Sequence, residues 1–173
     1  MSIEPDTKDW TWVLERPCAE CGFDAMKLRR DWMASDVRRY AADWQLVLIR
    51  PDVRRRPMPE TWSALEYGCH VRDVFRVFGA RTEMMLTEHD PTFPNWDQDE
   101  TAIKDRYPIQ DPVDVARELL EAAQVLAHRL SGVTGAQWSR TGRRSNGSQF
   151  TVDTLTRYML HDVEHHLWDV GRP

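Results

Sequence analysis

The sequence has no hydrophobic run that approaches the roughly 20 residues a helix needs to span a bilayer, so we predict no membrane partner. Its opening residues are acidic and polar, without a basic stretch followed by an apolar one, and we expect no secretory signal. With only 3 cysteines in 173 residues, the chain does not suit a disulfide framework. These absences together favour a cytoplasmic protein with reduced thiols.

An excess of positive charge is also missing, since the formal net charge is −5. Phosphate binding needs a basic face, so this balance argues against nucleic acid as the main partner. The arginine-rich stretches at 54–56 and 140–144 are local and typical of solvated loops. We therefore expect a small-molecule substrate and no nucleic-acid partner.

No strand pattern of useful length, internal repeat or low-complexity tract occurs in the chain. Apolar residues instead recur at intervals of three and four, which is typical of amphipathic helices. The length suits one domain, so we predict a single all-α domain over residues 1–173, with an N-terminal arm at 1–22 and a four-helix bundle at 24–170. The four helical segments are residues 24–49, 63–88, 111–132 and 151–168.

Local motifs mark the helix starts and the connections. A long connection between the second and third helices, residues 89–110, is of a length that is usually functional or contains short helical pieces. Residues 141–148 are rich in glycine, serine and arginine and predict a turn or short hairpin. The residues suited to cap helix N-termini are Asp24, the Ser63–Glu66 pair, and Asp111 followed by Pro112.

Three histidines form the main candidate site. His161 and His165 lie four residues apart on the last predicted helix, so they share one face and can bind one divalent metal ion. His70 lies on the apolar face of the second helix, and bundles place metal sites where inward side chains of facing helices meet. We predict three nitrogen ligands and one open position, as in catalytic zinc sites. An ordinary buried histidine is the alternative for His70.

Carboxylates near the histidines are candidates to orient them. Asp73 and Asp169 each lie about one turn beyond a predicted ligand, and metal-bound imidazoles usually donate their second N–H to a carboxylate. Ordinary surface ion pairs are the alternative for both. Asp162 is predicted to point to a neighbouring face, and His166 to be a non-ligand that could exchange roles with the adjacent histidine.

Cys18 and Cys21 form a C-x2-C pair in the arm. A structural zinc site would need a second pair, and Cys69 is the only other cysteine. A redox role would need a lowered thiol pKa. Structural, redox and incidental roles therefore remain open for this pair.

The sequence around these residues resembles a known family. Residues 62–73 (WSALEYGCHVRD) and 161–166 (HDVEHH) are similar to the DinB-like family of metal-binding four-helix bundles, which includes mycothiol- and bacillithiol-dependent enzymes. In that family one histidine of the second helix and a His-x3-His pair of the fourth bind a divalent metal, commonly zinc or nickel. The resemblance implies these roles for His70, His161 and His165, and it suggests a homodimer.

Three functions remain open. The resemblance implies a metal-dependent enzyme that holds a low-molecular-weight thiol as thiolate beside an electrophile, giving a thioether or an isomerised acid. The second function is a metal-dependent hydrolase of an amide or ester, with Glu66, one turn before His70, as the nearest candidate base. The third is a non-catalytic protein that binds a metal or a small ligand.

Overall fold

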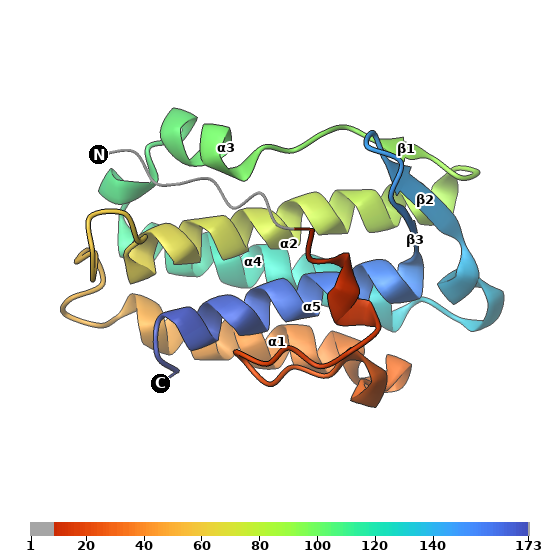
Figure 1. Cartoon of the computed structure of the whole chain (residues 1–173), viewed down its shortest axis with the longest axis horizontal. Coiled ribbons are helices and arrows are strands. Elements are labelled where there is room, and N and C mark those ends of the chain that lie inside the picture. Colours follow the sequence, from red (N-terminus) through yellow and green to blue (C-terminus); the bar gives the residue numbers. More distant parts are fainter. Residues whose placement is uncertain (1–8, 173) are drawn as a thin grey trace.

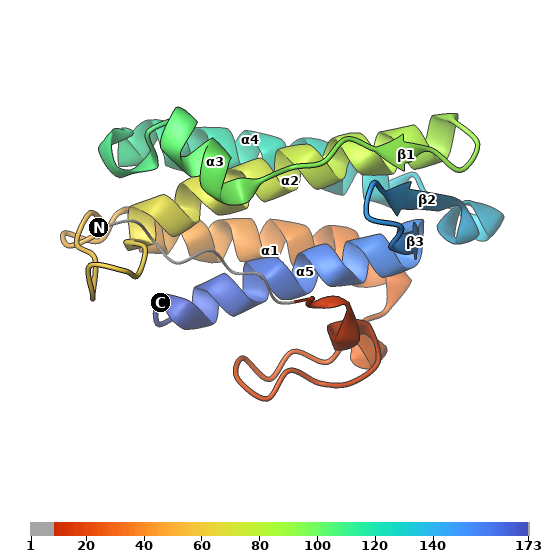
Figure 2. The same cartoon turned by 45° about the horizontal axis from the view of Figure 1, so that its top comes forward.

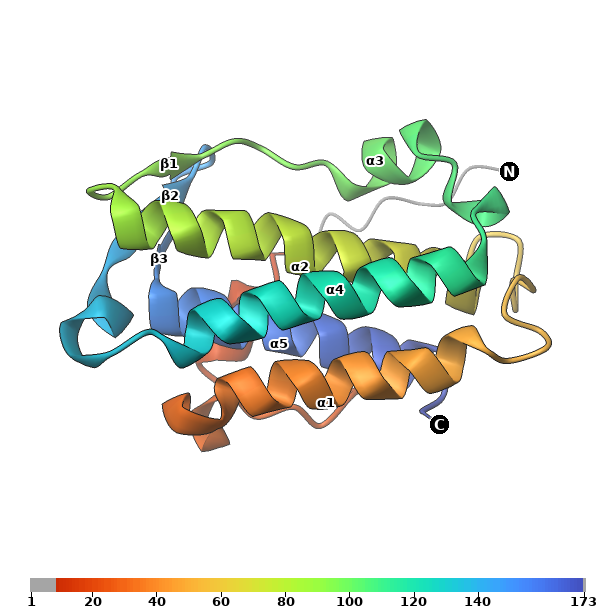
Figure 3. The ribbon, with the colours of Figure 1, turned by 180° about the vertical axis from the view of Figure 1, so that it is seen from behind.

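The computed structural model describes residues 9–172, which form the predicted four-helix bundle (Figure 1). The long helices neighbour one another in the order α1, α4, α2, α5, and α5 closes the ring against α1. The view from behind shows α4 and α1 side by side (Figure 3). None of the described helices is both long and apolar enough to cross a membrane. The four long helices are α1 (Arg30–Leu48), α2 (Ala64–Thr87), α4 (Pro112–Ser131) and α5 (Val152–Asp169).

Each long helix contributes a large apolar side chain to the centre of the bundle. Trp44, Phe75, Leu119 and Leu155, one from each helix, are at most 1% exposed. Burying such a side chain contributes about 1.5–3 kcal/mol relative to leaving it in water. This shared core fixes α2 against α5, the two helices that carry the predicted histidines.

Local sequence explains where two of the helices begin. The Ser63 hydroxyl accepts a hydrogen bond from the Glu66 N–H, and the Glu66 carboxylate accepts one from the Ser63 N–H at 2.8 Å, so the predicted capping box is confirmed. The first long helix begins later than predicted. Asp24 caps the short 3-10 turn Ala25–Lys27 instead, because the backbone is extended as far as Arg29.

The predicted connection and hairpin contain more structure than the sequence indicated. Residues 89–110 include α3 (Gln98–Lys104) and a 3-10 turn, which confirms the expected short helical pieces. One strand of this connection joins the predicted hairpin in a small sheet at one end of the bundle (Figure 1). The sheet was not predicted because strands this short carry no periodic pattern. Strand β2 (Thr141–Arg144) pairs with β1 (Thr92–Phe93) in parallel and with β3 (Gln149–Thr151) in antiparallel.

The arm lies along α5, on the side of the bundle away from α4 (Figure 2). Its described part includes the 3-10 turn Thr11–Leu14, which contacts α5. Val13 and Cys18 are buried. Residues 1–8 of the predicted arm lie outside the described residues. The arm therefore brings its two cysteines to the helix that carries the C-terminal histidines.

Candidate metal centre and pocket

A cavity of about 630 Å³ opens along α5. Its walls come from the arm, from residues 60–62, from the segment 95–99 that leads into α3, and from the β2–β3 hairpin. This volume is typical of a small-molecule site. The α5 side chains that line it are Tyr158, His161, Asp162, His165, His166 and Asp169.

Three donors meet between α2 and α5. His70 Nε2 lies 3.3 Å from Asp162 Oδ1, and His166 Nε2 lies 3.7 Å from the same oxygen. The ligand atoms of the three residues all lie within 4.8 Å of one another. Bonds of about 2.0–2.2 Å to a divalent ion put neighbouring donors roughly 3–3.5 Å apart. This set, which we name the α2–α5 group, therefore has nearly the spacing that a metal requires.

The surroundings of the α2–α5 group suit a cation. Burial opposes ionisation of Asp162, but His70 and His166 outweigh it and lower the pKa of this carboxyl to about 2. The second ring nitrogen of His166 lies 2.8 Å from an Asp169 oxygen, the contact that orients metal-bound imidazoles. His70 is fully buried, and its Nδ1 has no hydrogen-bond partner among residues 9–172. Asp169 was predicted to orient His165. In the structure Asp169 lies 2.8 Å from the ring of His166 and 3.9 Å from that of His165, so its closer partner is His166.

Aromatic rings enclose His70. Trp96 stacks parallel to the imidazole with ring centroids 5.6 Å apart, and Trp62 lies at 5.5 Å. Tyr67 lies 4.8 Å from the ring of His166. All three aromatic side chains line the cavity. Asp162 and His166 line the same cavity, so the three rings and two members of the group share its wall.

A second set of donors joins the arm to α5. Cys18, Cys21, His161 and His165 offer ligand atoms that lie within 4.8 Å of one another, and we name them the arm–α5 group. Burial, with a smaller contribution from His165, lowers the pKa of His161 to about 4, and burial also lowers the pKa of His165. Both imidazoles are therefore neutral at neutral pH. Burial raises the pKa of the Cys21 thiol to about 11.

The structure does not bring the three predicted histidine ligands into one group. His161 and His165 lie with the cysteines, whereas His70 lies with Asp162 and His166. Each residue of a helix is turned about 100° from the last. The pair at 161 and 165 therefore faces the arm, and the pair one residue later faces α2. The three-histidine site stays a prediction, and the contacts favour Asp162 and His166 as the partners of His70.

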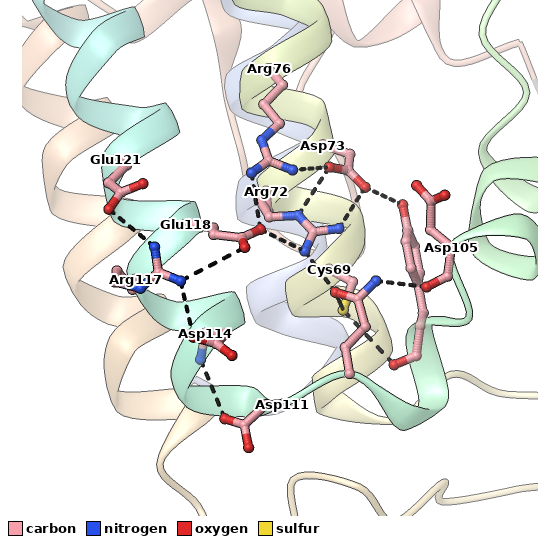
Figure 4. Close-up of polar contacts among 12 residues, drawn as sticks. Cys69, Arg72, Asp73, Arg76, Asp105, Asp111, Asp114, Arg117, Glu118 and Glu121 are labelled. Carbon is pink, nitrogen blue, oxygen red and sulfur yellow. Dashed lines mark hydrogen bonds and ion pairs between the residues drawn. The ribbon is translucent and has the colours of Figure 1, made fainter.

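Asp73, predicted to orient His70, lies in another network (Figure 4). It accepts hydrogen bonds from Arg72 and Arg76, and from the hydroxyl of Tyr107 at 2.6 Å. The Nε2 of His70 instead faces α5, as described above. These contacts give Asp73 a structural role that ties α2 to the connection.

Glu66, the candidate base, is also engaged away from the cavity. Its carboxylate accepts hydrogen bonds from Ser63 and from Arg56 Nε at 2.9 Å, and it does not line the cavity. Burial raises its pKa, but the hydrogen bonds from Arg56 and Ser63 leave the pKa below its usual value. A carboxylate held in this way is poorly placed to remove a proton from a substrate.

Arg81 is a pocket residue that the sequence did not reveal. It is 6% exposed and lines the cavity beside Arg144. Its guanidinium lies over the rings of Phe78 and Phe93 and donates to the Pro94 carbonyl, and no carboxylate of the described chain forms an ion pair with it. Burial and Arg144 lower its pKa to about 10, so it stays charged at neutral pH. Two neighbouring guanidiniums suit an anionic ligand.

The fold and the donor groups define a four-helix bundle with candidate metal ligands beside a pocket. The family model of the DinB superfamily matches residues 48–170, and the chain belongs to this superfamily. The structure is similar to that of YfiT from Bacillus subtilis, with a TM-score of 0.73 and 16% identity over 96% of this chain and 89% of that chain. YfiT is described as a probable metal-dependent hydrolase with an unusual four-helix bundle topology. Comparison with curated protein sequences finds no match.

Proposed function

We propose that this chain is a divalent-metal-dependent enzyme that transfers a low-molecular-weight thiol to a small anionic electrophile, or isomerises it. The α2–α5 group holds the metal. One observation carries the proposal: this three-donor set meets at a cavity that also contains Arg81, a buried cation with no carboxylate partner among the described residues. Membership of the DinB superfamily supports it.

The donor set fits zinc. Two imidazoles and a carboxylate are the protein ligands of one known kind of catalytic zinc site, and three protein ligands leave a position open. Nickel also accepts imidazole and is the second candidate. When bound, the ion supplies a Lewis acid that favours the thiolate form of a thiol.

The protein's own side chains would position the substrate. Arg81 and Arg144 would receive a carboxylate of the electrophile, because guanidinium groups bind carboxylates through paired N–H donors. Trp62 and Trp96 would keep water from the buried face of His70. Addition of the thiol to the double bond of maleate forms one C–S and one C–H bond. The proton that the thiol loses would pass to water and carbon would take one from water, so no side-chain base is needed at a site where Asp169 is already held by His166.

Hydrolysis of an amide or ester is the second candidate, and the likeness to YfiT favours it. Glu20, half exposed at the cavity wall, is a carboxylate that could serve as its base. Hydrolysis and thiol transfer are separable because only one of them consumes a thiol.

The test combines zinc-loaded protein with mycothiol or bacillithiol and maleate, and measures the thioether by chromatography. We expect the wild type to consume the thiol. Asp162→Asn should abolish both this consumption and zinc binding by the α2–α5 group. If the protein instead cleaves ester or anilide substrates without thiol, and Asp162→Asn abolishes this cleavage, the activity is hydrolysis and not thiol transfer. Conversion of maleate to fumarate with thiol present but not consumed would indicate the isomerase form of the proposal. Zinc binding without thioether formation, isomerisation or hydrolysis would indicate a non-catalytic binding protein.

The role of Arg81 has its own test. Arg81→Gln should raise the KM for maleate roughly 10- to 100-fold, the effect of losing a charge-assisted hydrogen bond. Dimethyl maleate, which has no charge, should be unaffected. Arg143→Gln is the matched control, because Arg143 pairs with Asp90 and does not line the cavity. Equal changes in the KM for maleate in Arg81→Gln and Arg143→Gln would show that Arg81 does not bind the anion.

The role of Asp169 is tested by metal affinity. Asp169→Asn weakens the acceptor of the His166 ring N–H, so zinc should bind the α2–α5 group roughly 10- to 100-fold more weakly in a chelator competition. Asp153→Asn, on the same helix but paired with Arg30, is the control. Unchanged zinc affinity in Asp169→Asn would show that this contact does not support the metal.

We also infer that the protein acts in the cytoplasm as a homodimer. The low cysteine count of the sequence suits a reducing compartment, and the family resemblance supports the dimer. Light scattering on the purified protein measures the oligomer, and a monomer at all concentrations would exclude it.

A further inference from the structure

The arm–α5 group combines two thiols and two imidazoles in one buried place. We propose that Cys18, Cys21, His161 and His165 form a second metal site, a closed four-ligand zinc site that fastens the arm to α5. It is distinct from the α2–α5 group and does not depend on the proposed reaction. Four protein ligands leave no open position, which is the mark of a structural site.

The distances suit a tetrahedral ion. Cys18 Sγ lies 3.7 Å from His165 Nδ1, and the four ligand atoms lie within 4.8 Å of one another. Zinc bonds of about 2.3 Å to sulfur and 2.0–2.1 Å to nitrogen place tetrahedral neighbours roughly 3.3–3.8 Å apart. Closing the site therefore requires small side-chain movements and no rearrangement of the bundle.

The backbone presents both thiols in a tight turn. The Gly22 N–H donates to the Cys18 carbonyl at 3.0 Å, and the Cys18 N–H donates to the Phe23 carbonyl at 2.8 Å. Gly22 has a φ of +76°, a conformation that glycine adopts without strain. The two cysteines of the turn have a C-x2-C spacing, and His161 and His165 on α5 have an H-x3-H spacing. Both spacings occur in structural zinc sites.

Contacts around the imidazoles supply independent support. While Nδ1 of His165 faces Cys18, its Nε2 lies 3.3 Å from a Glu20 oxygen and 3.9 Å from Asp169. A carboxylate on the far nitrogen is the usual arrangement for a metal-bound imidazole. His161 is 3% exposed, and its Nε2 has no hydrogen-bond partner in the described part of the chain. A buried nitrogen without a partner is unfavourable unless something binds it.

The site would shape the wall of the pocket. Trp10, which lies 5.5 Å from the ring of His161 and 5.1 Å from that of His165, lines the cavity, as does Glu20. Phe23 covers His161 from the arm at 5.4 Å. A metal ion here would hold this part of the arm against α5 and so keep one wall of the cavity in place.

The test measures metal content and cobalt spectra. Purified, reduced protein titrated with zinc should bind one equivalent more than Cys18→Ser/Cys21→Ser, whereas Cys69→Ser, which removes a buried thiol elsewhere, should match the wild type. Cobalt should give a thiolate-to-metal charge-transfer band that the double variant loses and that Asp162→Asn retains. Equal zinc content in the double variant and the wild type, or cobalt binding without this band, would overturn the proposal.

Alkylation keeps the proposal testable if the double variant does not fold. In the wild type, zinc should protect both Cys18 and Cys21 from iodoacetamide, and a chelator should reverse the protection. Mass spectrometry locates the modified residues. Equal labelling with and without zinc, or a Cys18–Cys21 disulfide that persists in zinc-loaded protein under reductant, would contradict the site. If the arm–α5 group binds no zinc while the α2–α5 group binds it normally, only the second metal site is excluded and the proposed enzyme is unaffected.

Discussion

In the metal-free protein, His161 should control stability toward acid. It is 3% exposed, and burial together with His165 lowers its pKa from 6.5 to about 4. A histidine with a lowered pKa binds fewer protons when folded than when unfolded. The stability that the neutral imidazole contributes is therefore fully present above about pH 6.5 and is lost as the pH falls toward 4.

The size of this effect follows from the two pKa values. The gap between 6.5 and about 4 corresponds to about 3 kcal/mol in full, of which about 2 kcal/mol is lost by roughly pH 5. Urea unfolding, followed by tryptophan fluorescence in chelator and reductant, measures the free energy of unfolding at roughly pH 7.5 and pH 5. His161→Gln does not titrate in this range and should lose about 2 kcal/mol less than the wild type. Equal losses, or a His161 pKa near 6.5 by NMR, would refute the reasoning.

Two further predictions concern packing and a buried hydrogen bond. Gly68→Ala places a Cβ 2.7 Å from Leu48 Cδ2, so the buried Leu48 side chain must leave its position or α1 and α2 must separate, and thermal unfolding should show a loss of roughly 1–3 kcal/mol. Gly132→Ala, which meets only ordinary contacts, is the control, and equal losses would exclude the packing explanation. Tyr107→Phe removes the hydroxyl that donates to Asp73, and should lower the free energy of unfolding by about 1–3 kcal/mol in urea. An unchanged value would show that this hydrogen bond contributes nothing net.

The helical architecture was predictable because its determinants are local. Apolar periodicity identifies the four long helices, and the Ser63–Glu66 capping box gives the start of α2. Asp111 followed by Pro112 gives the start of α4 in the same way. Asp24 misled the prediction because a cap residue can begin a short turn as well as a long helix. The three-stranded sheet depends on pairing between distant segments, which local patterns do not contain.

The candidate site was predictable in its residue types and not in its grouping. Whether His165 or His166 faces α2 depends on the rotation of α5 about its axis, and one residue changes that rotation by about 100°. The grouping of His161 and His165 with the two cysteines depends on the path of the arm. It places Cys18 beside His165, although 147 positions separate them. The C-x2-C and H-x3-H spacings were both visible in the sequence, but considered apart they did not indicate a common site. Arg81 carried no signal, because its burial depends on the hairpin that packs near it.

The most direct test of the metal centre is an anomalous difference map at the zinc edge, from crystals grown with zinc. We predict a peak between the ligand atoms of His70, Asp162 and His166. A single peak shared by His70, His161 and His165, or no peak beside His70, would contradict this assignment.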